Sequence, residues 1–278
     1  MDTREKKQQV LQWHPAFFAG LQIELKGDAE NLIFENEHQL GTKPKEIDVL
    51  IIKKEVAKPV RKNIGRIFRK YNIIEYKSPQ DYLGVDDFYK VYAYACFYKS
   101  DAAGEDSIKI EEITISFVCN SYPEKLINHL REIGNYSIIE TEKGIYYLYG
   151  DKMPMQLIVT KELSEENLWL KSLTNHLTGT ETADNLLREY GHNKEDKLYK
   201  SVMDMIVRAN KEKFVEVKTM CEALEELMKD ELDAKEEEGE TKVNSLIVKL
   251  SEAGRMEDIV RAAKDREYQK KLFAEFGI

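Results

Sequence analysis

The sequence has few cysteines and no long apolar run, and these absences exclude several classes of protein. Cys96, Cys119 and Cys221 lie far apart and form no CxxC pair, so neither a disulfide framework nor a thiolate zinc site is indicated. No run of 18 apolar residues is present, which argues against a membrane-spanning helix of ordinary length. The charged amino terminus lacks the features of a secretion signal. We therefore expect a reduced, soluble, cytoplasmic protein without a membrane partner.

Motifs for nucleotide cofactors and for zinc hydrolysis are also missing. The chain contains no Walker loop and no dinucleotide-binding glycine pattern, both of which have recognisable spacings. Its five histidines show neither HxxxH nor HExxH spacing, so packing or exposure explains them better than zinc binding. The chemistry of this protein must come from other residues.

The chain of 278 residues, 42% hydrophobic and 33% charged, is long enough for a large domain with an appendage. Its patterning predicts helices and strands in alternation. In chain order we expect a helix at 11–26, strands at 31–40, 46–53 and 72–77, a helix at 87–98 with Asp86 as its N-cap, a strand at 110–118, a helix at 123–133, and strands at 137–140, 145–149 and 155–160. This order is typical of a mixed α/β domain.

After about residue 162 the pattern becomes helical. We expect an α/β domain at 1–162, a helical region at 163–228, an acidic linker at 229–242 and a pair of helices within 243–278. Gly254 separates the two helices of that pair, which we place at 243–253 and 256–276.

Positive charge is concentrated near the amino terminus, although the net charge of the chain is −9. Residues 1–80 carry a net +4 and the remainder a net −13. Eight basic residues fall between the second and third strands: Lys53, Lys54, Lys58, Arg61, Lys62, Arg66, Arg69 and Lys70. Such a run can follow a nucleic-acid backbone, and a solvated loop is the plainer interpretation.

Three ionic residues stand among apolar neighbours on these two strands. Asp48 lies within 46–53, while Glu75 and Lys77 share one face of the strand at 72–77 because side chains alternate. A carboxylate on a strand covered on both faces is unfavourable without compensation. A divalent cation such as Mg²⁺ between Asp48 and Glu75 would supply it, and Lys77 would then reach the scissile phosphate or the attacking water. The basic run would hold nucleic acid beside this site.

An Asp followed at a distance by Glu-x-Lys is weak evidence alone, since a surface Glu–Lys pair has the same spacing. In context the sequence resembles the PD-(D/E)XK nuclease superfamily, and more closely its recombination-promoting, transposase-associated branch. The segments that carry the resemblance are WHPAF at 13–17, LQIEL at 21–25, IDVLIIKK at 47–54, YNIIEYKSP at 71–79 and DDFYKVY at 86–92. Asp48 follows isoleucine, where the superfamily pattern has proline.

The resemblance implies a restriction-endonuclease-like αβββαβ core with a mixed sheet, followed by an all-helical carboxyl-terminal region. It implies that Asp48 and Glu75 bind Mg²⁺ or Mn²⁺, that the Tyr76 carbonyl and the helical Glu24 add ligands, and that Lys77 is catalytic. The glutamine that the superfamily often has in the next helix is absent, and Tyr89 or Lys90 would replace it.

The expected activity is that of a metal-dependent DNA endonuclease linked to recombination. A homodimer would suit cutting of both strands. Two alternatives stay open: a catalytically silent module that binds DNA or protein, and an RNA nuclease. Glu35 and Glu37 on the first strand are further metal-binding candidates, although a solvated hairpin edge explains both.

Overall fold

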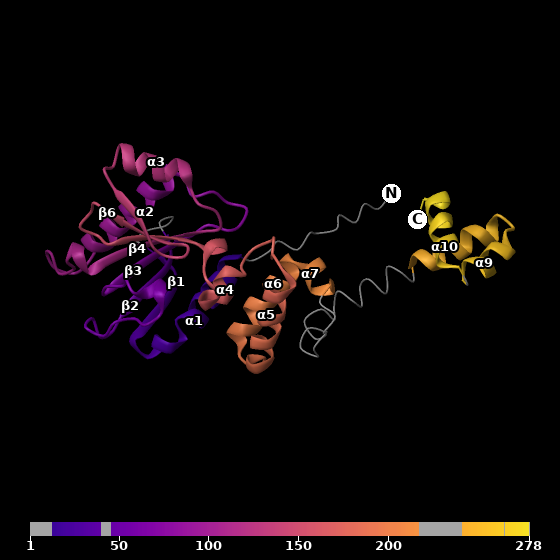
Figure 1. Cartoon of the computed structure of the whole chain (residues 1–278), viewed down its shortest axis with the longest axis horizontal. Coiled ribbons are helices and arrows are strands. Elements are labelled where there is room, and N and C mark those ends of the chain that lie inside the picture. Colours follow the sequence, from indigo (N-terminus) through magenta and orange to yellow (C-terminus); the bar gives the residue numbers. More distant parts are fainter. Residues whose placement is uncertain (1–12, 40–45, 217–240, 264, 278) are drawn as a thin grey trace. The chain divides into compact units, whose positions relative to one another are not determined.

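The computed structural model describes residues 13–39, 46–216, 241–263 and 265–277. The chain divides into two compact units, Met1–Thr219 and Met220–Ile278, which we treat separately (Figure 1). The first unit is built on a seven-stranded sheet with the order β1-β2-β3-β4-β7-β6-β5. In the described part of the chain, no helix combines the length and apolarity that a membrane span requires.

The sheet is mixed. Its strands are β1 (Leu32–Gln39), β2 (Glu46–Lys53), β3 (Tyr71–Tyr76), β4 (Ile113–Cys119), β5 (Ser137–Glu142), β6 (Ile145–Tyr149) and β7 (Met155–Val159). The central strands β3, β4 and β7 run parallel, and the pairs β1–β2, β2–β3, β5–β6 and β6–β7 are antiparallel. Three helices accompany them: α1 (Trp13–Glu24), α2 (Val85–Ser100) and α3 (Glu124–Glu132). The predicted α/β class and the order α1-β1-β2-β3-α2-β4 are confirmed.

Short 3₁₀ helices join several of these elements, at Lys26–Asn31, Asn63–Gly65, Ile110–Glu112, Thr160–Glu162 and Glu165–Asn167. One of them occupies the start of the strand that we expected at 110–118. The predicted N-cap of α2 is also wrong. The helix begins after Gly84, and Asp87 reaches back so that its Oδ2 accepts a 2.9 Å hydrogen bond from the Gly84 N–H. Asp86 therefore lies inside the first turn.

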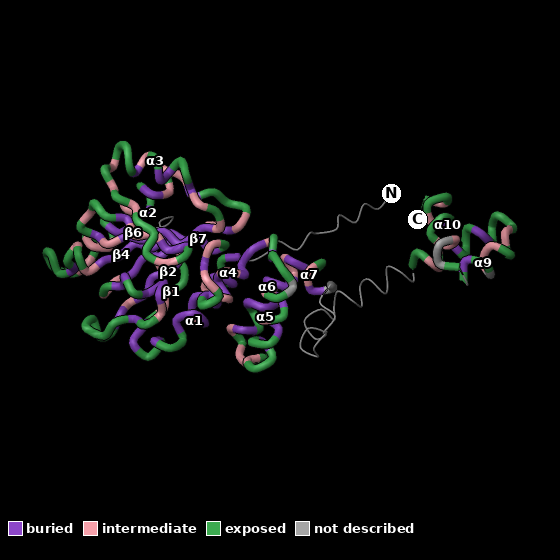
Figure 2. The backbone as a smooth tube through the Cα atoms, viewed as in Figure 1, coloured by how far each residue is buried: buried purple, intermediate pink, exposed green. Residues whose placement is uncertain are grey.

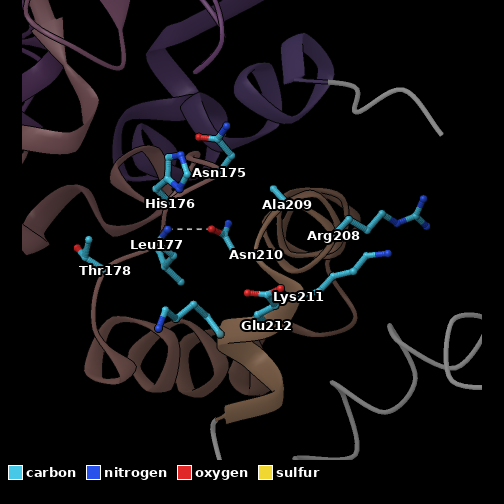
Figure 3. Close-up of a pocket in the computed structure, with 10 residues that line it drawn as sticks. Asn175, His176, Leu177, Thr178, Arg208, Ala209, Asn210, Lys211 and Glu212 are labelled. Atoms are coloured by element: carbon cyan, nitrogen blue, oxygen red, sulfur yellow. Dashed lines mark hydrogen bonds between the residues drawn. The ribbon is translucent and has the colours of Figure 1, made fainter. Parts of the chain in front are cut away.

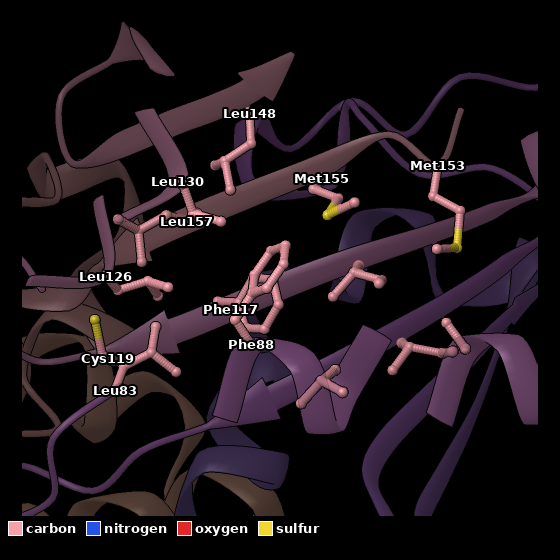
Figure 4. Packing of buried hydrophobic residues seen from close by; sticks show 14 of the residues in the cluster. Leu83, Phe88, Phe117, Cys119, Leu126, Leu130, Leu148, Met153, Met155 and Leu157 are labelled. Atoms are coloured by element: carbon pink, nitrogen blue, oxygen red, sulfur yellow. The ribbon is translucent and has the colours of Figure 1, made fainter. Parts of the chain in front are cut away.

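Helices cover both faces of the sheet. Helices α2 and α3 pack on one face, where Phe88 meets Phe117 of β4 in an apolar cluster (Figure 4). Glu75 is level with Phe117 in the β3–β4 register, so it faces the same side. The next residue, Tyr76, points to the opposite face because side chains alternate, and its ring stacks on Phe17 of α1 at 4.1 Å.

The strands that carry the candidate site are buried on both sides. Ile47, Val49, Leu50, Ile73 and Ile74 are each at most 2% exposed. This confirms the expectation that charged residues on β2 and β3 stand among apolar neighbours, where an uncompensated charge costs free energy.

The helical region belongs to the same compact unit as the sheet. It consists of α4 (Leu168–Lys171), α5 (Thr180–Asn193), α6 (Lys197–Ala209) and α7 (Lys211–Glu216). Helices α4 and α6 pack on α1, where Gly20 lies against the side chains of Leu170 and Val202. Figure 2 shows buried residues along α4 and α6 as well as in the strands. The expected boundary at 162 is therefore not a boundary between compact units. Helices α4 and α6 pack on α1 and so bury part of its apolar surface.

The second unit contains helical residues 241–252, α9 (Met256–Ala262) and α10 (Arg266–Phe276). Leu246, Leu250, Ala262 and Leu272 form its core. The expected second helix, 256–276, is split, because Asp265 Oδ1 accepts a hydrogen bond from the Tyr268 N–H and starts a new helix. The expected helical pair is thus three helical segments within the described residues. Residues 217–240, which include the end of the helical region and most of the linker expected at 229–242, lie outside the described residues, and residues 241 and 242 of that expected linker are helical.

Candidate functional site

Asp48, at the start of β2, lies beside the end of β3. The two strands are antiparallel, with Val49 opposite Ile74, so the start of one and the end of the other meet at the same edge of the sheet. Asp48 Oδ2 accepts a 2.9 Å hydrogen bond from the backbone N–H of Tyr76. This contact holds the Asp48 carboxylate against the segment that carries Glu75 and Lys77.

The carboxylates of Asp48 and Glu75 act on one another electrostatically. Removal from water raises the pKa of Asp48, and the negative charge of Glu75 raises it further. The Tyr76 N–H and the charges of His14 and Lys77 oppose this shift without reversing it. The Asp48 side chain stays 26% exposed, whereas Glu75 is only 4% exposed. Two close carboxylates, one of them open to solvent, favour a cation at this place.

Lys77 and two residues of α2 complete an ionic cluster around Glu75. Lys77 Nζ lies 3.1 Å from Glu75 Oε1 and 2.8 Å from Asp87 Oδ1. Lys90 Nζ lies 3.1 Å from the same Glu75 oxygen and 3.8 Å from Asp87 Oδ1. The structure thus brings the predicted residues Asp48, Glu75 and Lys77 together.

The charge state of Lys77 follows from its neighbours. Burial by itself lowers the pKa of Lys77, but the hydrogen bonds to Asp87 and Glu75 outweigh it and leave the pKa above its ordinary value. Burial likewise opposes ionisation of Asp87, while the hydrogen bonds from Lys77 and from the Gly84 N–H prevail and lower its pKa. Lys77 is therefore held as an ammonium group, fixed in direction by two carboxylates.

Sequence reasoning missed Asp87 and gave Lys90 only a secondary place. The signal was present in the spacing: residues three apart on a helix share a face, and Phe88 and Val91 mark the buried side of α2 next to them. Tyr89, the other candidate to replace the glutamine, contacts α3 and not the ionic cluster. Its hydroxyl lies 2.9 Å from His129 Nε2 of α3.

A cavity of about 240 Å³ opens beside Asp48, lined by His14, Phe17, Asn36, Glu37, Asp48 and Val49. Glu37 has a φ of 50°, unusual for a residue other than glycine. It stands opposite Asp48, between the register pairs Asn36–Val49 and His38–Ile47. Glu35 is engaged differently, since its carboxylate contacts the His38 ring. Of the two acidic residues of β1 that we considered, only Glu37 shares a cavity with Asp48.

The structure places Glu24 away from this cluster. Its carboxylate lies 2.8 Å from Lys62 Nζ and accepts hydrogen bonds from the N–H groups of Trp169 and Leu170 at 2.9 and 3.3 Å. Burial raises the pKa of Glu24, against the opposing effect of Lys62 and these N–H groups.

The position of Glu24 on α1 also separates it from Asp48. His14, in the first turn of α1, lies 4.0 Å from Asp48, and Glu24 follows ten residues later, about 15 Å along the helix axis. The expectation that Glu24 shares a metal ion with Asp48 is corrected accordingly. Glu24 joins α1 to α4 instead.

The basic run lies at the wrong edge of the sheet to accompany Asp48 and Glu75. It connects the end of β2 to the start of β3, and the Lys53 N–H closes it by donating to the Lys70 carbonyl at 2.8 Å. Asp48 and Lys53 stand at opposite ends of β2, about 17 Å apart at the usual rise per residue. The expectation that this run holds nucleic acid beside the site is therefore corrected.

Several side chains of the run are also occupied within the protein. Lys62 pairs with Glu24, Arg61 with Asp28 at 3.3 Å, and Arg66 with Glu142. The remaining members are distributed as follows: Lys53 is buried, Lys54 donates to the Glu30 carbonyl, Lys58 and Arg69 are exposed, and Lys70 lies over the Tyr71 ring. The run mainly ties the connection between β2 and β3 to its surroundings.

The chemistry of the donor set fits a hard divalent cation. Among the residues that the structure describes, no group of three acidic, histidine or cysteine side chains is placed to hold a metal ion. Mg²⁺, however, is commonly bound by one or two carboxylates while it keeps several waters and contacts substrate phosphate. Asp48 and Glu75 supply two such carboxylates.

Comparison of the chain with protein-family models, with curated proteins and with solved structures finds no match. The interpretation of this site therefore depends on its own geometry and chemistry.

Proposed function

We propose that this protein is a Mg²⁺-dependent DNA endonuclease that hydrolyses phosphodiester bonds, with Asp48, Glu75 and Lys77 as its catalytic residues. The observation that carries the proposal is the convergence of these three ionic groups at one sheet edge, fixed by the Tyr76 N–H that binds Asp48. The order α1-β1-β2-β3-α2-β4 is the order of a restriction-endonuclease-like core, which supports the same conclusion.

Asp48 and Glu75 would hold the cation. The Tyr76 carbonyl suits a third ligand position, because a residue in an antiparallel pair directs its N–H and its C=O toward the same neighbour, and the N–H of Tyr76 reaches Asp48. Glu37 lines the cavity beside Asp48 and would add negative charge to the site. When bound, the cation supplies a lowered pKa for a coordinated water and stabilises charge on the scissile phosphate.

Lys77 supplies positive charge where negative charge develops. Its ammonium group is positioned before substrate arrives, by Asp87 at 2.8 Å and Glu75 at 3.1 Å. Preorganised donors of this kind stabilise a transition state without the cost of reorganisation. Asp87 acts through Lys77 and is a positioning residue. Lys90 Nζ lies 3.1 Å from Glu75 Oε1, so its positive charge offsets the negative charge of Glu75.

The link to recombination or mobile DNA follows from the sequence resemblance alone. The two alternatives, an RNA nuclease and a silent binding module, keep the same fold. A substrate panel separates the first from a DNA nuclease. The presence of Asp48, Glu75 and Lys77 together at one sheet edge favours an active site over the second.

The test is nicking of supercoiled plasmid by full-length protein with Mg²⁺, beside Asp48→Asn and Lys77→Ala variants that are shown to be folded and Lys58→Ala as a control at the opposite sheet edge. We expect Mg²⁺-dependent nicking by the wild type and the control and at least a hundredfold loss in the other two. Linear product would indicate paired sites, as in a homodimer. Equal activity in all four proteins would reveal a contaminant and refute the proposal.

A further inference from the structure

A second cavity, of about 510 Å³, lies at the same edge of the sheet as the candidate site. It opens where the parallel strands β4 and β7 end. Asn120 and Ser121 follow β4, and Lys161 and Glu162 follow β7. The register places Tyr76 beside Val118, and Cys119 beside Val159, so the ends of β3, β4 and β7 are adjacent. In open α/β sheets the crevice outside the carboxyl ends of parallel strands is a usual place for ligands.

The helical region forms the opposite wall of this cavity. The wall consists of Lys171, Thr174, His176, Leu177, Thr178 and Thr182. The loop that carries most of them is fixed by Asn210, which is 6% exposed. Asn210 Oδ1 accepts from the Leu177 N–H at 2.8 Å, and its Nδ2 donates to the Thr174 carbonyl at 2.6 Å. Figure 3 shows the first of these contacts from the side of a neighbouring cavity.

That neighbouring cavity, of about 430 Å³, shares His176, Leu177 and Thr178 with the first. Two of its basic residues, Arg208 and Lys211, extend away from His176 (Figure 3).

The lining of the cavity at the strand ends suits a nucleotide. Lys161 Nζ donates to the Ser121 hydroxyl at 3.2 Å and contacts no carboxylate of the described residues. Lys171 contributes a second ammonium group, in contact with Glu165. The acidic member of the lining, Glu162, accepts a 2.8 Å hydrogen bond from the Tyr146 hydroxyl. Two ammonium groups and several hydroxyls are typical ligands of a phosphodiester.

Asn120 gives a separate indication. Its Oδ1 is buried and has no hydrogen-bond partner among the residues that the structure describes, which is rare for a buried polar atom. A phosphate offers no proton to this acceptor, whereas the amino and imino groups of a nucleobase do; because the protein shields Oδ1, the Asn120 side chain has to rotate toward a bound base to accept one. The cavity thus combines groups for the phosphate and a group for the base of one nucleotide.

We propose that this cavity binds a nucleotide of the cleaved strand about three steps from the scissile phosphate. Two strand spacings separate β3 from β7, about 10 Å, which corresponds to about three nucleotide steps at 3.4 Å each. The inference rests on the proposed function for the identity of the strand, and it assigns to Lys161 and Lys171 the role that the sequence had suggested for the basic run.

The experiment measures binding of a fluorescein-labelled 20-nucleotide single-stranded DNA to the full-length protein by anisotropy, without divalent cation. The variants are Lys161→Ala, Lys161→Ala/Lys171→Ala and Lys58→Ala, the last removing an exposed lysine at the opposite sheet edge. We expect the double variant to bind at least tenfold more weakly, with a salt dependence reduced by about one to two ions. Lys161→Ala should fall between, and Lys58→Ala should match the wild type.

The outcomes separate this inference from the proposed function. A wild type that binds but never cleaves, together with weakened binding by the Lys161 variants, supports the cavity and refutes only the nuclease. A wild type that cleaves plasmid while the double variant binds like the wild type refutes only the cavity. Equal weakening by Lys58→Ala also overturns the inference. Lys161→Ala keeps the Lys171–Glu165 contact, so it serves as the test if the double variant unfolds.

Discussion

The carboxylate of Asp48 accepts a 2.9 Å hydrogen bond from the backbone N–H of Tyr76. This contact joins the first residues of β2 to the segment that carries Glu75 and Lys77, which follow Asp48 by 27 and 29 positions in the chain. The proposed catalytic activity follows from that arrangement.

Asp48 is expected to reduce stability in the absence of metal. Because burial and Glu75 raise its pKa, the folded state favours the protonated form, and its ionised form is a disadvantage at neutral pH. Asp48→Asn should increase the free energy of unfolding at pH 7 by about 0.5–2 kcal/mol while abolishing nicking.

The sign of the pH dependence provides the check on that prediction. Below the ordinary aspartate pKa of about 4, Asp48 is protonated in both folded and unfolded chains, so the difference between variant and wild type should disappear. Denaturant unfolding in metal-free buffer across this pH range measures it. A variant less stable than the wild type at pH 7 would contradict the account.

Asp87 is expected to affect catalysis because it positions Lys77. Lys77→Ala should lower kcat about 10²- to 10³-fold, because it removes a preorganised charge. Asp87→Asn keeps the acceptor for the Gly84 N–H but weakens the hold on Lys77, and should lower kcat about 10- to 100-fold with little change in KM. Steady-state cleavage of a labelled oligonucleotide separates the two constants. An effect of Asp87→Asn on KM alone would show that it does not position Lys77.

Glu24 is expected to be structural. Glu24→Gln removes the charge that pairs with Lys62 while leaving an acceptor for the N–H groups on α4. Because burial raises the pKa of Glu24, this substitution should lower the free energy of unfolding at pH 7 by no more than about 1 kcal/mol. Affinity for Mg²⁺ should stay within about twofold of the wild type. A large loss of Mg²⁺ affinity at unchanged stability would restore Glu24 as a metal ligand.

Glu37 and Glu35 offer a matched pair on β1. Glu37 lines the cavity beside Asp48, and Glu35 contacts His38. Glu37→Gln should weaken Mg²⁺ binding about tenfold, the usual effect of a residue close to the metal ligands, and Glu35→Gln should leave it unchanged. Isothermal titration with Mg²⁺ distinguishes them. Equal effects of the two substitutions would assign both to general surface charge.

The strands β2 and β3 could be predicted because residues 49–52 and 73–74 are apolar residues typical of buried strands, and the alternation of side chains then placed Glu75 and Lys77 on one face. The edge of the sheet at which the basic run lies could also have been predicted from the order and direction of the strands. A connection between antiparallel neighbours leaves the end of one strand and enters the start of the next, so the run belongs at the edge opposite Asp48.

Other features depend on contacts between distant parts of the chain. Glu24 binds the N–H groups of Trp169 and Leu170, and no local pattern links α1 to a segment some 145 residues later. The cavity at the ends of β4 and β7 arises in the same way, since its walls come from the sheet and from the helical region. Periodicity predicts elements and faces, but it does not predict which helix covers which face.

The central claim is that Asp48 and Glu75 hold one divalent cation beside Lys77. Its most direct test is Mn²⁺ binding, measured by electron paramagnetic resonance, to the wild type and to the Asp48→Asn, Glu75→Gln and Glu24→Gln variants. The account predicts one Mn²⁺ site per chain, lost in the first two variants and retained in Glu24→Gln. Unchanged binding in Asp48→Asn and Glu75→Gln, or no binding by a folded wild type, would contradict it.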